Sequence, residues 1–343
     1  MNILIIRLSS LGDVVLATSV VEYLKSSFPQ SSIWFATEQE YAGLFTADPR
    51  VTRVVALERG KEGKAVSELS GVAWDNIVDL QNNGRSVRIR RHIPAKAPVS
   101  VFKKRRLERA VLLLGRVNLY PQGDSVIARY ARAAGYSGHD PRDFPPARLC
   151  LDERTCEQAM RFFPSSAVVR PAVALFPFSA WKNKEWPIAK FAFVGRYFAI
   201  KGWDVFIAGG PQDTRAGESL RRSIGERCVS VAGKLSLYET ACLLQRCRLA
   251  LGNDTGLSHM ARACGVKTGV IYGPTTSHFG FYPSGNPPFR VFEASQFCRP
   301  CHAHGGNICL TGSRNCLKKI PPEAVIAGLE NLYHQNDEAE TDL

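Results

Sequence analysis

No part of this 343-residue chain predicts a membrane span, because no apolar run reaches the roughly 18 consecutive residues that a span requires. Only five apolar-leaning residues precede Arg7, which is too few for the apolar region of a signal peptide. These two absences predict a cytoplasmic protein whose ten cysteines are mostly reduced. Its length and 45% hydrophobic content are sufficient for two domains, each with its own core.

Acidic residues are scarce between Arg85 and Arg116, where eleven Lys or Arg residues accompany a single acid, Glu108. This region holds most of the formal net charge of +13. Such a patch can bind nucleic acid, an anionic membrane surface or an acidic substrate, or it can be a solvated face. No helix-turn-helix, zinc-finger or RNA-recognition signature accompanies it, so we expect no nucleic-acid partner. Peripheral contact with a membrane stays open.

Short apolar runs alternate with helical patterns, which predicts an α/β protein with parallel sheets covered on both faces. Strands are expected at 2–6, 32–36, 52–57, 74–80 and 98–102, and again at 172–176, 205–208, 228–232, 249–251 and 268–272. An amphipathic helix is expected at 14–28 and a helix with proline in its first turn at 187–200. This pattern predicts two doubly wound, Rossmann-like domains facing across a cleft, at 1–160 and 161–321. A C-terminal helix and an acidic tail, at 322–343, could pack on either domain.

The stretch 251–261 predicts a strand, a polar turn and the start of a helix. The free N–H groups and the dipole of a helix N-terminus favour anions. The turn offers three residues that commonly cap such groups, Asn253, Asp254 and Thr255. Gly256 allows close approach of a ligand, and His259 could hydrogen-bond the same anion. The alternative is a capped structural helix with a packing histidine.

Polar residues also follow other expected strands. The turn after the first strand has one glycine, so it is not a dinucleotide-binding G-x-G-x-x-G motif, but it places Asp13 at a helix N-terminus. A carboxylate there suits a general base, and the alternative is a simple N-cap. Lys184 precedes a helix and could hold a phosphate, while Asp213 could accept ribose hydroxyls. A further loop at 233–237 completes the pattern of a nucleotide site.

These segments resemble, in order and over nearly the whole chain to about residue 320, the ADP-heptose:lipopolysaccharide heptosyltransferase family. The matching motifs are Ser9-Ser10-Leu11-Gly12-Asp13, Lys184-Glu185-Trp186-Pro187, Gly209-Gly210-Pro211, Ala232-Gly233-Lys234 with Ser236-Leu237, Gly252-Asn253-Asp254-Thr255-Gly256 with His259, and Tyr272-Gly273-Pro274-Thr275. The resemblance implies the GT-B arrangement, with the donor nucleotide on the C-terminal domain, the acceptor on the N-terminal domain, and neither a metal nor a cofactor. Ala180 departs from the pattern, since many members have a second hydroxyl residue there.

The resemblance further implies an inverting glycosyltransferase that moves a heptose from ADP-heptose to the Kdo/heptose inner core of lipopolysaccharide. Asp13 would deprotonate the acceptor hydroxyl. The residues expected to bind the donor are Ser179, Lys184, Asp213, Leu235, Asp254, Thr255, Gly256 and His259. Those expected to bind the acceptor are Ser9, Ser10, Lys103, Lys104, Arg105 and Arg106. The expected partners are therefore ADP-heptose and Kdo-lipid A or the growing core at the inner leaflet. The alternatives are a related GT-B enzyme with another nucleotide sugar or a non-lipid acceptor, and a non-catalytic polyanion-binding protein.

Four of the ten cysteines fall within nineteen residues, with two histidines among them. The group is Cys298, Cys301, His302, His304, Cys309 and Cys316. Its spacing permits a zinc site, disulfide pairing or reduced packing cysteines, and these alternatives stay open. The other six cysteines occur in apolar or helical patterns and are predicted to be small core residues. They are Cys150, Cys156, Cys228, Cys242, Cys247 and Cys264.

Overall fold

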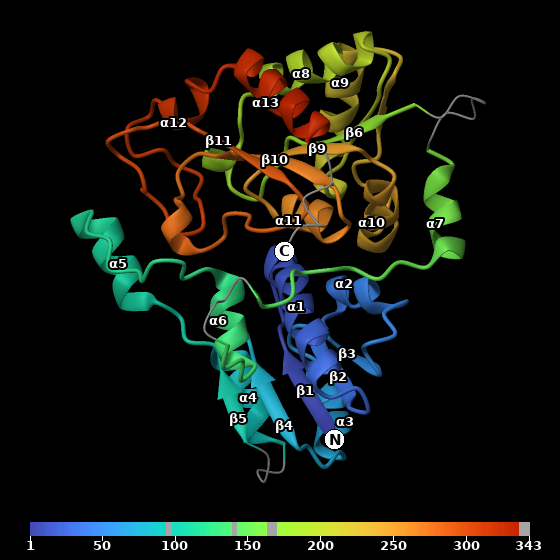
Figure 1. Cartoon of the computed structure of the whole chain (residues 1–343), viewed down its shortest axis with the longest axis vertical. Coiled ribbons are helices and arrows are strands. Elements are labelled where there is room, and N and C mark those ends of the chain that lie inside the picture. Colours follow the sequence, from blue (N-terminus) through green and yellow to red (C-terminus); the bar gives the residue numbers. More distant parts are fainter. Residues whose placement is uncertain (94–97, 139–142, 163–169, 336–343) are drawn as a thin grey trace.

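The computed structural model describes residues 1–93, 98–138, 143–162 and 170–335, which form two α/β domains stacked along the long axis of the molecule (Figure 1). The first sheet is parallel, with strand order β3-β2-β1-β4-β5. Its strands are β1 (Asn2–Ile6), β2 (Ser32–Glu38), β3 (Arg53–Leu57), β4 (Asn76–Asp79) and β5 (Val99–Val101). Strand β1 is central, and its side chains from Ile3 to Ile6 are fully buried because helices cover both faces.

The second sheet is also parallel, with order β11-β10-β9-β6-β7-β8. Its strands are β6 (Ala172–Phe176), β7 (Asp204–Ile207), β8 (Cys228–Ser230), β9 (Leu249–Asn253), β10 (Lys267–Tyr272) and β11 (Phe289–Glu293). The two-domain GT-B fold and its strand series are thus confirmed. Strand β11 was not expected, because its alternating sequence follows a stretch rich in proline and glycine. In each sheet the strand order reverses beside the first strand, where α/β proteins bind ligands.

Helices connect the strands and flank both sheets (Figure 1). They are α1 (Leu11–Ser27), α2 (Gln39–Ala42), α3 (Gly63–Ser70), α4 (Gly84–Arg91), α5 (Arg106–Gly115), α6 (Val126–Ala133), α7 (Glu153–Met160), α8 (Ile188–Ile200), α9 (Thr214–Ile224), α10 (Leu237–Gln245), α11 (Gly256–Ala263), α12 (Asn315–Lys318) and α13 (Pro322–His334). None of these described helices has the length and apolar content needed to cross a bilayer.

The sequence pattern predicted an amphipathic helix here, but α1 is buried on most of its surface. Even its polar residues Thr18 and Ser19 are fully buried, and their hydroxyls donate to the carbonyls of Val15 and Leu16 at 2.7 Å. The cause is tertiary, because α1 covers the first sheet on one side and contacts α11 of the second domain on another. A helix enclosed by both domains has exposed residues only at its C-terminal end, Ser26 and Ser27.

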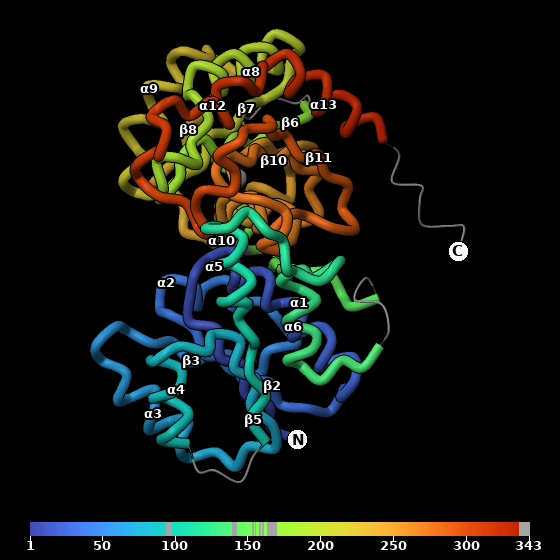
Figure 2. The backbone as a smooth tube through the Cα atoms, turned by 90° about the vertical axis from the view of Figure 1, so that its left-hand side faces the viewer, coloured from blue at the N-terminus to red at the C-terminus, as the bar shows by residue number. Residues whose placement is uncertain are grey.

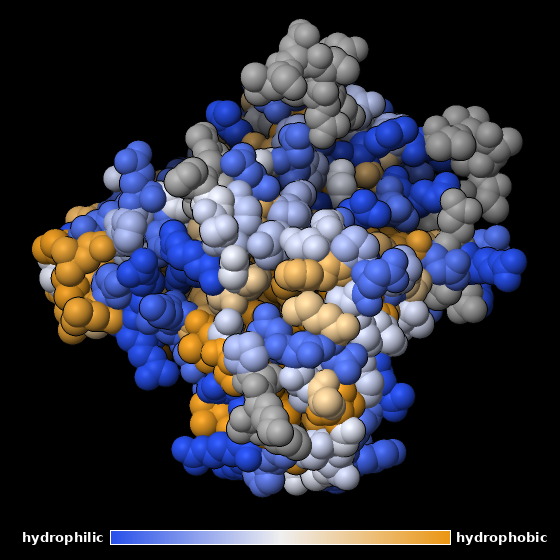
Figure 3. All heavy atoms as spheres, turned by 60° about the horizontal axis from the view of Figure 1, so that its bottom comes forward, coloured by the Kyte–Doolittle hydropathy of each residue, from blue (hydrophilic) through white to orange (hydrophobic). Residues whose placement is uncertain are grey.

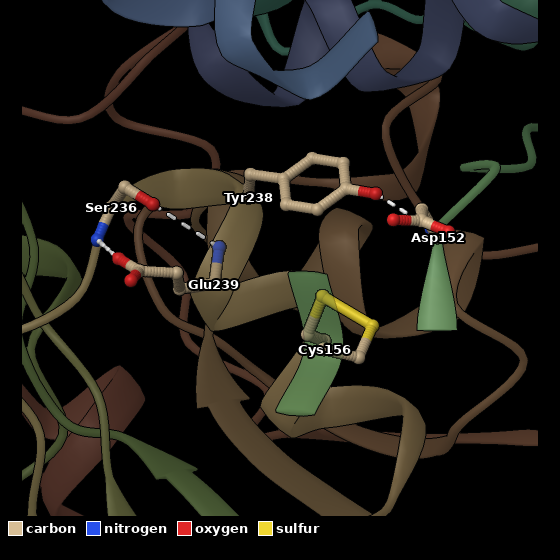
Figure 4. Close-up of a disulfide and its surroundings, with 6 residues drawn as sticks. Asp152, Cys156, Ser236, Tyr238 and Glu239 are labelled. Atoms are coloured by element: carbon tan, nitrogen blue, oxygen red, sulfur yellow. Dashed lines mark hydrogen bonds between the residues drawn. A yellow bond between two sulfur atoms is a disulfide. The ribbon is translucent and has the colours of Figure 1, made fainter. Parts of the chain in front are cut away.

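The segment between the domains carries α7, which packs against α10 of the second domain. Cys156 on α7 and Cys242 on α10 form a disulfide (Figure 4). Both are buried, as predicted, but their pairing was not predicted, because a partner 86 residues away leaves no local signal. The same junction holds a bond from the backbone N–H of Asp152 to the hydroxyl of Tyr238 (2.6 Å). The remaining four of these cysteines are free and buried or half-buried.

Helix α13 packs on α8, β10 and β11, and so belongs with the second domain. Its apolar side chains Val325, Leu329 and Leu332 are buried there. Residues 336–343, which include most of the expected acidic tail, lie outside the described residues.

Candidate active site between the two domains

A cavity of about 850 Å³ lies between the domains, at the carboxyl ends of the central strands of both sheets. The first domain contributes several lining residues, and Ser10 and Asp13 are among them. From the second domain it is lined by all eight expected donor residues, which are Ser179, Lys184, Asp213, Leu235, Asp254, Thr255, Gly256 and His259. Loops separated by more than 240 residues in the chain therefore meet around one space that is large enough for a nucleotide sugar.

Asp13 lies in the first turn of α1 and is held by three side chains. Its Oδ1 accepts a salt bridge from Arg7 (2.7 Å) and a hydrogen bond from the hydroxyl of Tyr130 (3.2 Å). Its Oδ2 accepts from the hydroxyl of Ser10 (3.1 Å). Burial raises the pKa of Tyr130, which keeps this phenol a donor at neutral pH. Oδ2 also accepts a longer bond from the backbone N–H of Ser10 (3.5 Å), which makes Asp13 part of a capping box at the start of α1. The carboxylate is thus fixed in orientation, with Oδ2 bound only by Ser10 among the described residues.

The N-termini of α1 and α11 meet at the cavity. A Cβ atom on Gly12 would lie 2.8 Å from the imidazole Cδ2 of His259, and one on Gly256 would lie 2.7 Å from the Cβ of Leu11. Only glycines permit this approach of the two helices. Both helix dipoles therefore point their positive ends at the same space.

The N-terminus of α11 is not capped by the side chains that the sequence suggested. Asn253 turns into the core instead, where its amide accepts from the backbone N–H of Trp186 (3.0 Å) and donates to the carbonyl of Pro177 (2.9 Å). The hydroxyl of Thr255 is buried and finds no hydrogen-bond partner among the described residues. The first turn of α11 therefore has unused donors aimed at the cavity, which is the arrangement that binds anions.

Lys184 adds a positive charge at this helix end. Its Nζ lies 2.6 Å from Oδ2 of Asp254 and also donates to the backbone carbonyl of that residue (3.2 Å). The same carboxylate oxygen accepts from the hydroxyl of Thr275 (2.9 Å). Asp254 is thus the residue that holds the ammonium in place, so that Lys184 can serve as a fixed cation for a ligand.

Two histidines border the cavity, and burial lowers the pKa of both. His259 belongs to α11, and the carboxylates of Asp254 and Asp13 only partly oppose the effect of burial. For His304 the neighbouring Arg109 lowers the pKa further. Neutral imidazoles are expected at pH 7, so these side chains would contact an anion as hydrogen-bond donors and not as cations.

The loops after β6 and β7 form the remaining wall with Ser179 and Asp213. The Oγ of Ser179 accepts from the backbone N–H of Trp181 (3.1 Å). One oxygen of Asp213 accepts from the backbone N–H of Gly210 (2.9 Å), which leaves the other available to a hydroxyl ligand. Burial raises the pKa of Asp213, and the bond from Gly210 acts in the opposite direction.

Five of the six residues expected to bind the acceptor do not line this cavity, namely Ser9, Lys103, Lys104, Arg105 and Arg106. The backbone N–H of Ser9 donates to the side chain of Gln81 (3.2 Å). Arg105 pairs with Glu108 (2.8 Å) and Asp124 (3.1 Å), so it stabilises the first domain locally. Burial, and then the neighbouring charges of Arg7 and Arg106, lower the pKa of Lys104.

Comparison with known proteins places this arrangement in a family. A match to glycosyltransferase family 9 (heptosyltransferase) covers residues 63–308. The chain belongs to this family. It is 27% identical over 305 residues to lipooligosaccharide heptosyltransferase 2 of Haemophilus influenzae, covering 81% of this chain and 85% of the relative.

Solved structures agree with the fold. The glycosyltransferase superposes on E. coli ADP-heptose LPS heptosyltransferase II with a TM-score of 0.75 and 22% identity, covering 97% of this chain and 98% of the other. It superposes on the family 9 glycosyltransferase of Veillonella parvula with a TM-score of 0.79 and 20% identity, covering 98% of each chain. The protein is therefore a member of the heptosyltransferase family of glycosyltransferases.

Three residues around the site of this glycosyltransferase were missed by the sequence analysis: Arg7, Tyr130 and His304. Arg7 carried a usable signal, because a cation directly after a wholly apolar strand must find a buried partner. The others carried none, since Tyr130 is 117 positions from Asp13 and His304 was considered only as a metal ligand.

The four clustered cysteines of the glycosyltransferase surround a small cavity of about 10 Å³ beside Asn183 and Arg314. All four thiols are free. Within the described part of the chain no group of three or more His, Cys, Asp or Glu residues is arranged to hold a metal ion. Disulfide pairing among these four cysteines is therefore not what the structure shows. Burial raises the pKa of Cys301 to about 11.

Proposed function

We propose that this glycosyltransferase transfers a heptose from ADP-heptose to the Kdo/heptose inner core of lipopolysaccharide, with inversion and without a metal. One observation carries the proposal. The open N-terminus of α11 and Lys184 form an anion site in the same cavity as the fixed carboxylate of Asp13. A diphosphate leaving group and a general base are the two elements that such a transfer requires.

The donor diphosphate would lie at the first turn of α11. Lys184, the unpaired hydroxyl of Thr255 and the neutral imidazole of His259 would hold it. Asp213 and Ser179 would face the ribose, and Leu235 the adenine. As the bond to the sugar breaks, its electron pair moves to the β-phosphate, where the Lys184 cation and the hydrogen-bond donors of Thr255 and His259 stabilise the charge.

Asp13 would act from the side of the cavity opposite the donor diphosphate. The acceptor oxygen attacks the anomeric carbon on the face away from ADP, and the hydroxyl proton passes to Oδ2 of Asp13. Arg7 and Tyr130 both bind Oδ1, so they orient the carboxylate without blocking the second oxygen. Because Ser10 donates to Oδ2, it would also help to place the acceptor hydroxyl.

The acceptor would approach over the first domain, where phosphates and Kdo carboxylates meet cations. Lys103, Lys104 and Arg106 would bind these anions outside the cavity, and Ser9 would support the turn after β1. Arg105 would contribute indirectly, since it is already paired with two carboxylates.

Calorimetric titration with ADP, GDP and UDP in the absence of metal is the first test. We expect selective, micromolar binding of ADP. An Asp13→Ala variant should keep this binding and lose transfer by about 100-fold or more, the usual contribution of a general base. Transfer within about tenfold of the unmodified enzyme, or about 1.4 kcal/mol of barrier, would contradict the role of Asp13.

The same titration separates the alternatives. Preference for GDP or UDP would retain a GT-B transferase but change its donor. Binding of none of the three nucleotides would favour a polyanion-binding protein.

A further inference from the structure

Exposed apolar side chains gather in two short segments beside the cleft. Of the fifteen large hydrophobic residues that are exposed in the described chain, seven fall between residues 107 and 119 or between 297 and 310. They are Leu107, Leu114, Val117, Leu119, Phe297, Ile308 and Leu310. Isolated exposed apolar residues are ordinary, but a concentration of this kind marks an interaction surface.

Helix α5 carries apolar residues on two faces. One face packs into the protein, where Leu112 is buried against Tyr120 and Phe279. The other face presents Leu107, Ala110 and Leu114, whose spacing of three and four residues places them in one stripe. Leu107 is 71% exposed and Leu114 is 88% exposed. A helix needs one apolar face for its own core, so the second face is available to a partner.

The second segment lies against α5 although it belongs to the other domain. A nitrogen of Arg109 lies 3.1 Å from Nε2 of His304, and the guanidinium of Arg116 donates to the carbonyl of Pro300. Figures 1 and 2 show α5 extending away from the first sheet to reach the second domain. Figure 3 shows apolar atoms at the edge where Figure 1 places α5, with hydrophilic side chains beside them. The two segments therefore form one surface, which we call the α5 surface.

Cations border the α5 surface. Lys103, Arg106 and Arg116 are exposed, and none of them pairs with a carboxylate among the described residues. Apolar side chains flanked by unpaired cations match the chemistry of an anionic bilayer, which offers an apolar interior beneath negative headgroups.

We infer that the α5 surface docks on an anionic lipid bilayer, with its apolar side chains in the headgroup layer and its cations against the lipid phosphates. The inference rests on the proposed function, since it gives the lipid-linked acceptor a route to the cavity. His304 lines that cavity and contacts α5, so docking would place the cleft opening close to the bilayer. The acceptor could then reach Asp13 while its acyl chains stay in the membrane.

Vesicle co-sedimentation tests the inference. The full chain is mixed with vesicles of phosphatidylcholine alone or with added phosphatidylglycerol, at low and high salt. We expect binding to the anionic vesicles only, weakened by salt because exposed charges are screened. A Leu107→Ser/Leu114→Ser double variant should bind about tenfold or more weakly, given the apolar area lost. The matched control is Ile200→Ser, an 85% exposed residue at the end of α8, which should bind normally.

The outcomes that overturn docking are distinct. They are absence of binding to anionic vesicles, equal binding to both vesicle types, and unchanged binding of a double variant that keeps the melting temperature of the parent. A change from dimer to monomer in the double variant would instead identify the α5 surface as a subunit interface. ADP binding, and transfer to a deacylated, water-soluble acceptor, test the proposed function separately. Both should be unchanged in the double variant, and their absence alongside normal vesicle binding would refute the function and leave docking intact.

Discussion

At the scale of single residues, the site combines side chains that already have hydrogen-bond partners with side chains that have none among the described residues. Asp13 is held by Arg7, Tyr130 and Ser10 and therefore has one orientation. Thr255 is the opposite case, because its buried hydroxyl has no partner among the described residues. Leaving a buried hydroxyl unpaired costs about 1–3 kcal/mol, and a bound anion would remove that cost. The contrast separates a carboxylate with a fixed orientation from a hydroxyl with an open bonding position.

His259 makes stability depend on pH in a defined direction. Its pKa is lowered by burial, so the unfolded chain binds more protons than the native one below the ordinary value of 6.5. The free energy of unfolding should therefore fall as pH decreases from 7.5 through 6.5. Thermal melts over this range should show a shallower dependence for His259→Gln. The matched control is His92→Gln, an exposed residue. Equal slopes for all three proteins would contradict this origin of the pH effect.

At the scale of elements, the candidate site lies where the N-termini of two helices approach each other. Helices α1 and α11 approach through Gly12 and Gly256, and Lys184 brings a cation to the same point. The strand ends position both helices, because each follows the central region of its own parallel sheet. The chemistry therefore depends on how closely the helices come together.

Removing the cation at this helix end should weaken nucleotide binding. In Lys184→Ala the carboxylate of Asp254 stays beside the diphosphate without its partner, so attraction is replaced by repulsion. We expect ADP affinity to fall by about 30-fold or more, as for other truncated buried charge pairs. Lys182→Ala provides the control, because Lys182 is in the same loop but is exposed and bonds Glu185. Calorimetry should show normal ADP affinity for that variant, and equal losses in both would exclude a specific role for Lys184.

Adding a single methyl group at the helix junction should also impair the site. In Gly12→Ala the new Cβ would lie 2.8 Å from the ring of His259, so α11 or the imidazole must move. We expect lower ADP affinity and a free energy of unfolding reduced by about 1–3 kcal/mol. Gly43→Ala has open space around its Cβ and a negative φ, so it should be nearly neutral. Calorimetry and thermal melts on both variants make the comparison.

At the scale of the whole molecule, two features join the chain across its domains. Helix α1 is enclosed between the first sheet and α11, and α7 is tied to α10 through Cys156 and Cys242. Helix α5 makes a separate contact with the second domain through Arg109 and Arg116. The relative position of the domains is therefore set at several places along the cleft.

The Cys156–Cys242 disulfide should contribute to the stability of this junction. Reduction should lower the free energy of unfolding by about 2–4 kcal/mol, the range expected when a long loop loses its cross-link. Thermal melts with and without reductant should differ for the parent and coincide for Cys156→Ser/Cys242→Ser. Titration of the denatured, unreduced protein should detect the eight free thiols. Ten thiols and reductant-independent melting would contradict the cross-link.

Ten of the eleven strands in the described chain, the two-domain fold and the loops that line the cavity follow from the amino-acid sequence. Apolar runs and the polar turns that follow them are local, and parallel strands bring their carboxyl ends to one edge. For this reason Asp13, Lys184 and the α11 turn could be identified before the structure was examined.

Which distant groups contact each other depends on tertiary packing. The contact of Asp13 with Tyr130, the pairing of Cys156 with Cys242 and the burial of α1 on several sides all join segments far apart in the chain. The caps expected for α11 also failed, because Asn253 and Asp254 found better partners in the core and in Lys184. Local periodicity indicates which face of an element is apolar. It does not indicate what that face, or a polar side chain, will contact, because these contacts depend on how the whole chain packs.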